Sequence, residues 1–438
     1  MLAATIQKPM ARPLSIALLA LASTTLASCS LLFEVADNQA EEDIVLTREL
    51  VSTIGIESDF ATLAEWLSLR DGTLPQRQVM RVRSLGQRPG GEHVLAGANC
   101  AGLLRPVRAD TALTQLLILD LEPGSAECAA GEILVGTGNV QLEVIEALPK
   151  GTSEILRFET SPVLGPLTVD DEIVASEEYR LTLEAGIPHR GLSDVGIVIE
   201  NPPGTDAHGL RIGTDYTIVR GFEIRSWITT ETVDPYSAVR IAANYVEIDR
   251  LLVHDEASAL QVKSDGITTN SNVTGAIVRN SFLYDLGRAG IDDGWSQSEQ
   301  NPTPMVVSNC TLRRCTMFVD AGGRYGCVSF ERDKSTVFNT IALLEGGVGS
   351  AFLGNFSSDS DYNAGDEPQT PGALRSYNAS PEDFVGLTDL HLAPGSGPLF
   401  GCGIEGSPLE LDIDGEERPS SAWSIGADQS QGLGDCDE

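Results

Sequence analysis

The sequence is poor in aromatic residues and in basic ones. Phe, Trp and Tyr make up 5% of its 438 residues, against 42% for all hydrophobic types, so we expect an interior of Val, Ile, Leu and Ala. Only 29 residues are Lys or Arg against 63 Asp and Glu, which gives a net charge of -34. Such a charge repels phosphate backbones, so no nucleic-acid partner is expected. It suits a solvated surface in an extracellular or saline setting.

The sequence also lacks several motifs of common active sites. It has no CxxC pair, and its five histidines are scattered, which argues against a structural zinc site. No Gly-rich phosphate loop or nucleophile elbow occurs. Turn or surface positions without partners are expected for four of the histidines, His189, His208, His254 and His391.

An apolar run near the N-terminus, PLSIALLALASTTLASC, is too short and too rich in Ser and Thr to span a membrane well. Lys8 and Arg12 precede it, as in a signal peptide. Its end, LASC at residues 26–29, resembles the lipobox of bacterial lipoproteins. An ordinary signal peptide with an incidental cysteine is the alternative. We predict a signal peptide over residues 1–28 and lipid attachment at Cys29.

The lipobox resemblance also implies where the protein resides. Two or more acyl chains on Cys29 would hold it stably on a membrane, through an acidic linker at residues 29–45. Ser30, rather than Asp, follows the cysteine. By similarity to enterobacterial sorting signals, this implies the cell envelope, at the outer membrane or the cell surface.

A repeat of 29 or 30 residues is the strongest signal in the sequence. An aliphatic residue stands two positions before each anchor of the repeat, and another stands three positions after it. The apolar residues follow period two with no amphipathic helix between them, which excludes a βαβ solenoid. Stacked units would place equivalent residues of successive repeats next to one another, in strands about 4.8 Å apart. The sequence therefore predicts an all-β parallel β-helix with anchors at Gly221, Arg250, Asn280, Asn309 and Asn339.

The last three anchors explain why asparagine interrupts the strands. Asn tolerates a left-handed backbone and suits a sharp bend between strands. Stacked along the axis, Asn280, Asn309 and Asn339 would also hydrogen-bond to one another. This arrangement resembles the asparagine ladder of pectate-lyase-like right-handed β-helices, and its role is structural.

The remaining segments are expected to flank the repeats. We place the parallel β-helix at residues 176–365, and an N-terminal cap with the first rungs at 46–175. Residues 52–66 predict a strand and a short helix that covers the first rung, because an open coil would expose strand edges. An insertion near 76–150 does not fit the repeat, and its structure and role stay open. Residues 366–438 form a C-terminal closing segment.

Seven cysteines follow the lipobox. An exported chain forms disulfides, and neighbourhood in the sequence favours the pairs Cys100–Cys128 and Cys402–Cys436. Connectivity is not fixed by sequence. A trio at Cys310, Cys315 and Cys327 would leave one thiol free.

Motifs at both ends are similar to those of a family of secreted bacterial right-handed β-helix repeat proteins. Near the start these are TIG at residues 53–55 and YRLTLEAGIPHRG at 179–191. The tail motifs are DLHLAPGSGPLFGCG at 389–403, DIDGEERP at 412–419 and WSIGADQ at 423–429. The chain departs from the family's tail at Gly397, at Gly401-Cys402 and at Gln429, where the family has an acid. The resemblance implies a pectin-lyase-like architecture and brings no catalytic apparatus with it.

Acidic and basic residues between positions 263 and 293 are of the types that enzymes of this fold use. Pectate-lyase-type enzymes hold calcium with carboxylates and use Lys or Arg to remove a proton next to a uronate. Paired aspartates, as in GIDDG at 290–294, are also similar to those of hydrolases in which one acid protonates the leaving oxygen and the other activates water. The further His-Gly and Arg-Lys motifs of those hydrolases are not found in the sequence, so ordinary turn chemistry is favoured over catalysis. The candidate residues are Lys263, Asp265, Arg288, Asp292 and Asp293.

Two further groups are candidates for binding. Asp412 and Asp414 alternate like the start of a calcium loop, but Ser421 stands where an EF-hand has Glu, so either a structural ion or a polar turn is expected. Calcium is the one cofactor left open. Tyr216 and Tyr245 share a repeat column and should stack on neighbouring rungs; their packing in the fold is favoured over sugar binding.

The fold hosts enzymes, adhesins and scaffolds, so it does not fix an activity. We expect a lipid-anchored, non-catalytic β-helix protein of the bacterial envelope that binds glycan or envelope components. A calcium-dependent polysaccharide lyase, or a glycoside hydrolase, acting on an acidic polysaccharide is one alternative. A structural spacer or adhesin is the other. Convergence of the candidate acids in a groove beside Lys or Arg would favour an enzyme.

Overall fold

The computed structural model describes most of the chain after residue 48. The predicted signal peptide, Cys29, Lys263 and Cys436 lie outside the described residues. Within the described part, no helix has the length and apolar character that crossing a membrane requires. The described ranges are 49–55, 61–70, 72–86, 93–105, 114–159, 163–170, 173–200, 207–225, 237–255, 265–294, 304–317, 325–367, 370–372, 375–404, 411–419 and 423–429.

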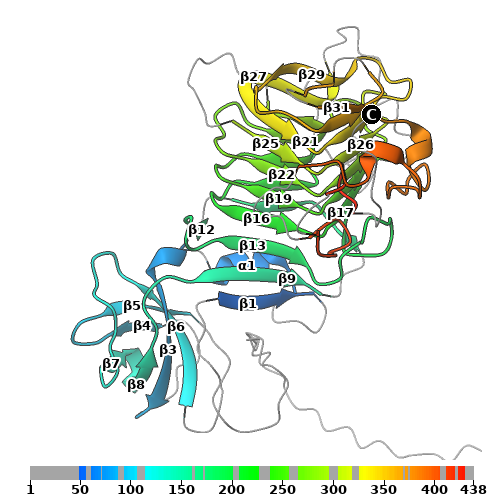
Figure 1. Ribbon diagram of the computed structural model, residues 1–438. Coiled ribbons are helices and arrows are strands. Elements are labelled where there is room, and N and C mark those ends of the chain that lie inside the picture. Colours follow the sequence, from blue (N-terminus) through cyan, green and yellow to red (C-terminus); the bar gives the residue numbers. More distant parts are fainter. Residues whose placement is uncertain are drawn as a thin grey trace, which may run out of the picture.

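A coil of short parallel strands makes up the larger part of the molecule (Figure 1). Each full turn of the coil contributes one strand to each of three sheets, and each strand pairs in parallel with its equivalent in the next turn. Sheets 1 and 3 meet in one long strand and together count 14 strands, whereas sheet 2 has nine. The predicted fold class, an all-β parallel β-helix, is confirmed.

The strands of each sheet follow in the order of their pairing. Sheet 1 contains β1 (Glu49–Ile54), β9 (Ser153–Phe158), β13 (Leu181–Ala185), β16 (Thr217–Arg220), β19 (Glu247–Asp249), β22 (Ile277–Arg279), β25 (Val306–Ser308) and β27 (Gly326–Phe338). Sheet 2 contains β10 (Val163–Leu164), β14 (Val198–Glu200), β17 (Glu223–Arg225), β20 (Leu252–His254), β23 (Phe282–Tyr284), β26 (Thr311–Arg313), β28 (Ile341–Leu343), β30 (Asn363–Gly365) and β31 (Ser376–Asn378). Sheet 3 contains β11 (Leu167–Val169), β15 (Leu210–Ile212), β18 (Ser237–Ile241), β21 (Asp265–Thr269), β24 (Ile291–Asp292), β27 and β29 (Ser350–Phe356).

The aliphatic columns of the repeat form the core of the coil. In sheet 1 the strand pairing joins, in register, Val219, Ile248, Val278, Val307 and Val337. All five side chains are fully buried. Burying a side chain of this kind contributes about 1.5 to 3 kcal/mol, so the stacked columns supply the main driving force for this region.

The anchor residues of the repeat make the bends between sheets 1 and 2. Asn280, Asn309 and Asn339 have φ values of 48°, 48° and 49°, in the left-handed region that asparagine tolerates. The ladder of hydrogen bonds predicted among them is absent from the described residues. Asn280 bonds to Asp249 and Arg418, and Asn339 bonds to the backbone of Ile404. Two of the three amides therefore turn to other partners, while both amide atoms of Asn309 have none among the described residues.

One helix covers the first turn of the coil. This helix, α1 (Leu63–Arg70), lies beside β1, β9 and β13 at the N-terminal end of the stack (Figure 1). Trp66 is fully buried in the same apolar cluster as Ile54 and Leu183. Next to it, β2 (Gly72–Thr73) pairs with β12 (Ile173–Val174). The short 3-10 helix η1 (Leu74–Gln76) then leads out of the coil.

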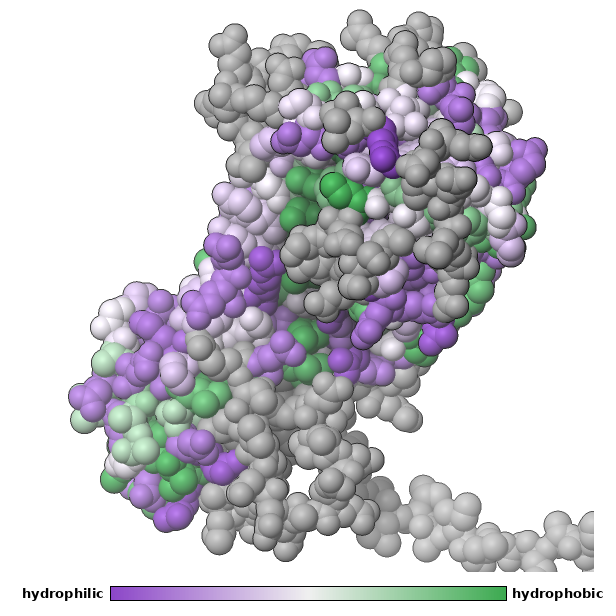
Figure 2. Space-filling model, viewed as in Figure 1, coloured by the Kyte–Doolittle hydropathy of each residue, from purple (hydrophilic) through white to green (hydrophobic). Residues whose placement is uncertain are grey.

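The insertion that the repeat did not explain is a closed antiparallel barrel. It interrupts the chain between β1 and β9, which pair with each other, so the chain leaves and re-enters the coil at one turn. Around the barrel the strands are β3 (Arg77–Ser84), β6 (Thr114–Leu121), β5 (Ala101–Arg105), β4 (His93–Ala96), β7 (Ile133–Gly136) and β8 (Gln141–Ala147), with η2 (Thr137–Asn139) before β8. Figure 2 shows apolar residues gathered over part of the barrel surface, and Val94, Ile133 and Val135 in β4 and β7 are about half exposed.

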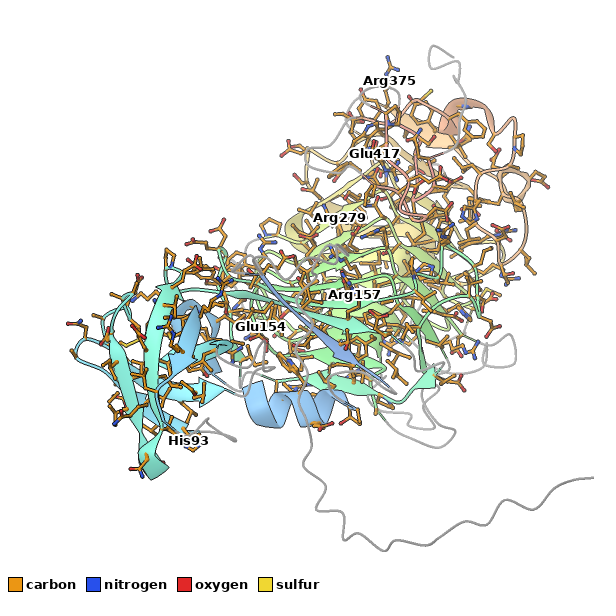
Figure 3. All side chains as sticks on the ribbon, turned by 90° about the horizontal axis from the view of Figure 1, so that it is seen from below. His93, Glu154, Arg157, Arg279, Arg375 and Glu417 are labelled. Carbon is orange, nitrogen blue, oxygen red and sulfur yellow. A yellow bond between two sulfur atoms is a disulfide. The ribbon has the colours of Figure 1, made fainter. Side chains whose placement is uncertain are left out.

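Charged and apolar contacts join the barrel to the coil. Arg77 is fully buried and bonds to Asp120 in the barrel and to Glu154 in β9 of the coil. Leu50 of the first turn packs against Val79 of the barrel. In Figure 3, Glu154 lies where the two regions meet.

The C-terminal segment, residues 375–429, lies along the outer face of sheet 2. It contains β31 and the 3-10 helices η4 (Pro381–Asp383) and η5 (Gly397–Leu399), and its other described residues form no regular helix or strand. Its apolar side chains share a buried cluster with outward-facing residues of β20, β23 and β28. The cluster includes Leu252, Phe282 and Ile341 from the sheet and Leu390, Leu399 and Ile425 from the segment.

Candidate functional site

A row of polar residues runs along the outer face of sheet 3. Strand alternation turns Val239, Ile267 and Ile291 into the core, where they are fully buried. The next residue of each strand faces outward, and the pairing places these residues side by side: Arg240, Thr268 and Asp292. A groove of about 420 Å³ lies over this row. Its lining comprises Arg240, Asp265, Thr268, Thr269, Asn270, Ser271, Asn272, Asp292 and Gly294.

Arg240 is fixed across the base of the groove. Its Nε donates to Asn270 Oδ1 at 2.7 Å, and one terminal nitrogen donates to Thr268 Oγ1 at 2.9 Å. Ser237 holds the Thr268 hydroxyl from the other side at 2.6 Å. The guanidinium is thus pre-oriented, which lowers the entropy cost of binding a ligand. The sequence analysis did not single out Arg240. Its position between Val239 and Ile241, in a strand that the repeat predicts, would have indicated that it faces outward.

The acidity of Asp265, in the groove, is perturbed by its surroundings. Burial raises its pKa to about 6, and the nearby charge of Asp292 acts in the same direction. Arg288 opposes this shift, with its Nε 3.7 Å from Asp265 Oδ1. A carboxyl that titrates near neutral pH is able both to donate and to accept a proton.

Arg288 lies behind Asp265. Its guanidinium stacks on the Tyr325 ring, 3.9 Å from the centroid, and bonds to the Tyr325 hydroxyl. The side chain is nearly buried. Arg288 therefore positions Asp265 and is not among the residues that line the groove.

The structure separates the two aspartates of the GIDDG motif. Asp292 lines the groove, with its Oδ1 accepting a hydrogen bond from the Gly294 N–H at 2.7 Å. Asp293 is fully buried and accepts hydrogen bonds from the Glu331 N–H and the Ser335 hydroxyl. Successive residues of a strand face opposite sides of the sheet, so the paired-aspartate interpretation was wrong for Asp293. Asp265 is the carboxyl that accompanies Asp292.

The DIDG motif in the C-terminal segment is mainly a turn. Asp412 accepts hydrogen bonds from the backbone N–H groups of Asp414, Glu416 and Gln429. Asp414 points elsewhere, with its Oδ1 3.2 Å from His391 Nε2. Asp412 is thereby occupied in shaping the loop, and Asp414 is the residue of the motif that faces another side chain.

His391 lies between acids of the C-terminal segment. Its Nδ1 is 2.5 Å from Asp389 Oδ1, and its ring meets Phe282 edge-on at 5.2 Å. Burial lowers the pKa of His391, but the hydrogen bonds with Asp414 and Asp389 outweigh burial and raise the pKa to about 9. Nearby, burial raises the pKa of Asp428 to about 6.

The expectation that the histidines lack partners was wrong. His189 is buried, with Nε2 2.9 Å from the Arg250 carbonyl and Nδ1 accepting from Gly191. His254 Nε2 is 2.9 Å from Glu223, and its ring stacks on Tyr284. The remaining contacts are those of His391 and one between His208 and the Ser237 N–H. Apart from Gly191 and Asp389, these partners come from other turns of the coil or from distant parts of the C-terminal segment, which the sequence of one turn does not reveal.

The cysteines divide between the two regions. A disulfide joins Cys100 and Cys128, one of the predicted pairs, across 5.1 Å between Cα atoms. Cys402 is also disulfide-bonded, and its predicted partner, Cys436, lies outside the described residues. The trio of Cys310, Cys315 and Cys327 stays reduced and buried in the coil, so the expected bond within the trio is absent. Buried thiols behave as small apolar side chains.

The predicted aromatic stack is confirmed. Tyr216 and Tyr245 lie face to face with centroids 4.8 Å apart. Gly275, the next residue in the column, leaves no room for a Cβ beside the Tyr245 ring. One face of each ring is thus used within the stack, and Gly275 lies against the Tyr245 ring.

The chain was compared with family models, with curated proteins and with solved structures. No family model matches it, and no curated protein matches it. A solved structure that resembles it is the alginate lyase from Paenibacillus sp. str. FPU-7, with 12% sequence identity and a TM-score of 0.36. The match covers 51% of this chain and 73% of the lyase.

Proposed function

We propose that this protein is a lipoprotein of the bacterial cell envelope that binds a polysaccharide chain in the groove on sheet 3. The observation that carries the proposal is the groove lining, in which a fixed guanidinium, carboxyl groups, hydroxyls and side-chain amides converge. Sugar hydroxyls both donate and accept hydrogen bonds, and these groups supply both kinds of partner. The volume of about 420 Å³ is in the range of small-molecule sites and suits a short stretch of a sugar chain.

The charge of the protein favours a neutral polysaccharide as the ligand. The chain carries a formal charge of -34, which repels a polyanion at a distance. In the groove itself, Arg240 lies among the carboxyl groups of Asp265 and Asp292, so no excess of positive charge is available for a uronate. No metal is required for this mode of binding.

The proposed anchor is the lipobox of the sequence. Acylation of Cys29 would fix the protein to the membrane, and the stretch from there to β1 at Glu49 would serve as a tether. We place the protein at the outer membrane or the cell surface, where a glycan is within its reach.

Cleavage of the bound glycan is a second candidate, favoured by the acidity of Asp265. A carboxyl with a pKa of about 6 donates its proton to the leaving glycosidic oxygen, and the Asp292 carboxylate takes a proton from a water molecule. The water oxygen bonds to the anomeric carbon as the glycosidic C–O bond breaks, which gives two shorter chains. Hydrolysis is favoured over β-elimination because Arg288, the arginine proposed from the sequence as the base, does not line the groove.

The test uses the full-length protein with neutral and uronate-containing polysaccharides, measured by affinity electrophoresis and by the release of reducing ends. Arg240→Ala should weaken binding at least tenfold. Arg211→Ala is the matched control, because Arg211 occupies the equivalent outward position one turn earlier and pairs with Asp170. Equal binding by both variants would disprove the groove as the site.

Cleavage is tested separately from binding. If the second candidate holds, the wild type releases reducing ends and Asp265→Asn binds the same glycan without releasing them. Glycan binding without any product from the wild type would reject cleavage and leave the binding proposal standing. Unsaturated products would show β-elimination instead of hydrolysis.

A further inference from the structure

Three separate parts of the C-terminal segment bring metal-binding donors together. A nitrogen of His391 and one carboxylate oxygen each of Asp414 and Asp428 lie within 4.8 Å of one another. The residues come from three different tail motifs, of which only the one that contains Asp414 begins like a metal-binding loop. The cluster lies outside the groove of sheet 3, so it is independent of the proposed function.

The histidine is oriented as a metal ligand would be. Its Nδ1 lies 2.5 Å from Asp389 Oδ1, so the Nδ1–H donates to this carboxylate. That bond directs Nε2 toward Asp414 Oδ1, 3.2 Å away. Metal-binding histidines commonly donate their other ring N–H to a carboxylate in this way, which fixes the ring and its tautomer.

Asp428 provides an independent observation. Its side chain belongs to a residue only 7% exposed, and Oδ2 accepts a hydrogen bond from the Leu392 N–H at 2.9 Å. Within the described part of the chain, Oδ1 has no hydrogen-bond partner. A carboxylate in a residue this buried is stabilised by a cation beside it, and a metal ion would supply that charge in place of a proton on His391.

We propose that His391 Nε2, Asp414 and Asp428 form a binding site for a divalent transition-metal ion of the zinc class. One imidazole and two carboxylates suit zinc, whereas calcium takes six to eight oxygen ligands. The side chains of His391 and Asp414 keep 18% and 25% exposure, which leaves room for water as a further ligand.

A metal here would cross-link the irregular segment that covers sheet 2. His391 contacts Phe282 of β23, and Asp428 holds the backbone next to His391. The ion would thus fix the loops that carry these three ligands against the coil. Binding to the folded state alone stabilises that state according to ligand concentration.

The first experiment is a zinc titration of the full-length protein, with free zinc set by a competing chelator. One ion should bind per chain. Asp414→Asn and Asp428→Asn should each weaken binding at least 100-fold, and Asp389→Asn should weaken it about 10- to 100-fold. His93→Ala, in the distant barrel, is the matched control and should bind like the wild type (Figure 3).

The second experiment uses only the wild-type protein, so its result does not depend on whether a variant folds. Thermal unfolding of the wild type should shift to higher temperature with zinc, and excess chelator should reverse the shift. Calcium at the same concentration should have no such effect. An absence of zinc binding by the wild type, or equal binding by the aspartate variants, would overturn the proposal. The cluster would then be an ion pair in which a proton on Nε2 holds Asp414.

Discussion

The coil and the inserted barrel reach stability by different routes. In the coil, each turn repeats the contacts of the previous one, and columns such as Val219, Ile248 and Val278 are buried by their own equivalents. In the barrel, each strand has its own partners, and one disulfide supplements a small core. A small core buries a smaller fraction of its apolar surface than a large one, so a cross-link makes a proportionally larger contribution to its stability. The contacts of a stacked fold therefore require similar residues at a fixed spacing in the sequence. The contacts of a barrel require no such spacing.

The same contrast extends to the cysteines. The coil keeps Cys310, Cys315 and Cys327 as buried thiols, although the sequence predicts export to an oxidising compartment. The barrel uses its two cysteines as a covalent bond. The coil is closed by packing along its axis, so it gains little from a cross-link within a turn, since short loops restrict the unfolded chain least.

The largest effect is expected where the two regions meet. Arg77→Ala removes a fully buried guanidinium and leaves Asp120 and Glu154 without it. Breaking a buried ion pair in this way costs about 3 to 5 kcal/mol. Urea unfolding should show the loss, and the barrel and coil should then unfold in separate steps.

Arg81→Ala is the control for the junction. Arg81 also lies in β3, but its contact with Glu146 is 3.6 Å long and half of the Glu146 side chain is exposed. Surface pairs of this kind contribute about 0 to 1 kcal/mol. Equal losses in the two variants would show that Arg77 does not couple the regions.

A second prediction concerns the barrel alone. The Cys100→Ala and Cys128→Ala double variant opens a loop of 28 residues, which should cost about 3 to 4 kcal/mol through the entropy of the unfolded chain. Hydrogen exchange should become faster in β3 to β8 and stay unchanged in the strands of sheet 2. A double variant is preferable to a reductant, because reduction would also open the bond of Cys402. Faster exchange throughout the coil would contradict an independent barrel.

The coil could be predicted from the sequence because its turns repeat every 29 or 30 residues. The spacing of Gly221, Arg250 and Asn280 gave the register, and alternation gave the buried columns. The barrel could not be predicted in this way. In β7, Leu134 is buried while Ile133 and Val135 are about half exposed, so an apolar run conceals which residue faces inward.

The candidate site was predicted in part for the same reason. Asp265 and Asp292 stand on equivalent strands of adjacent turns, and the groove contains both. Asp293 was misplaced because its neighbour in space is Ser335, more than one turn further along the chain. The partners of His391 come from separate loops without a period, so no pattern in the sequence joins them.

A third prediction concerns the loss of stability of the coil at acidic pH. Burial lowers the pKa of His189 to about 4, below its unfolded value of about 6.5. A lowered histidine pKa stabilises the fold fully above pH 6.5, and this contribution is lost as the pH falls from 6.5 toward 4. The loss should reach about 2 to 3 kcal/mol and should affect the coil, where His189 lies. In His189→Gln, the difference in unfolding free energy between pH 7 and pH 4 should shrink by that amount; an unchanged difference would refute the assignment.

The smallest expected effect is a difference in stability between two Asn→Gly variants at bends of the coil, one with a hydrogen-bonded amide and one without. Asn309 and Asn339 share a left-handed backbone that glycine adopts without strain. The entropy cost of Gly is similar at the two sites, so the difference between the two variants reports on the amides. Asn339 exchanges two hydrogen bonds with Ile404, at 2.6 and 2.8 Å, and Asn339→Gly should cost about 1 to 2 kcal/mol in urea unfolding. Both amide atoms of Asn309 lack partners, so Asn309→Gly should cost less than about 0.5 kcal/mol. Equal costs at the two sites would mean that stacked amides bond along the coil after all, as the sequence predicted.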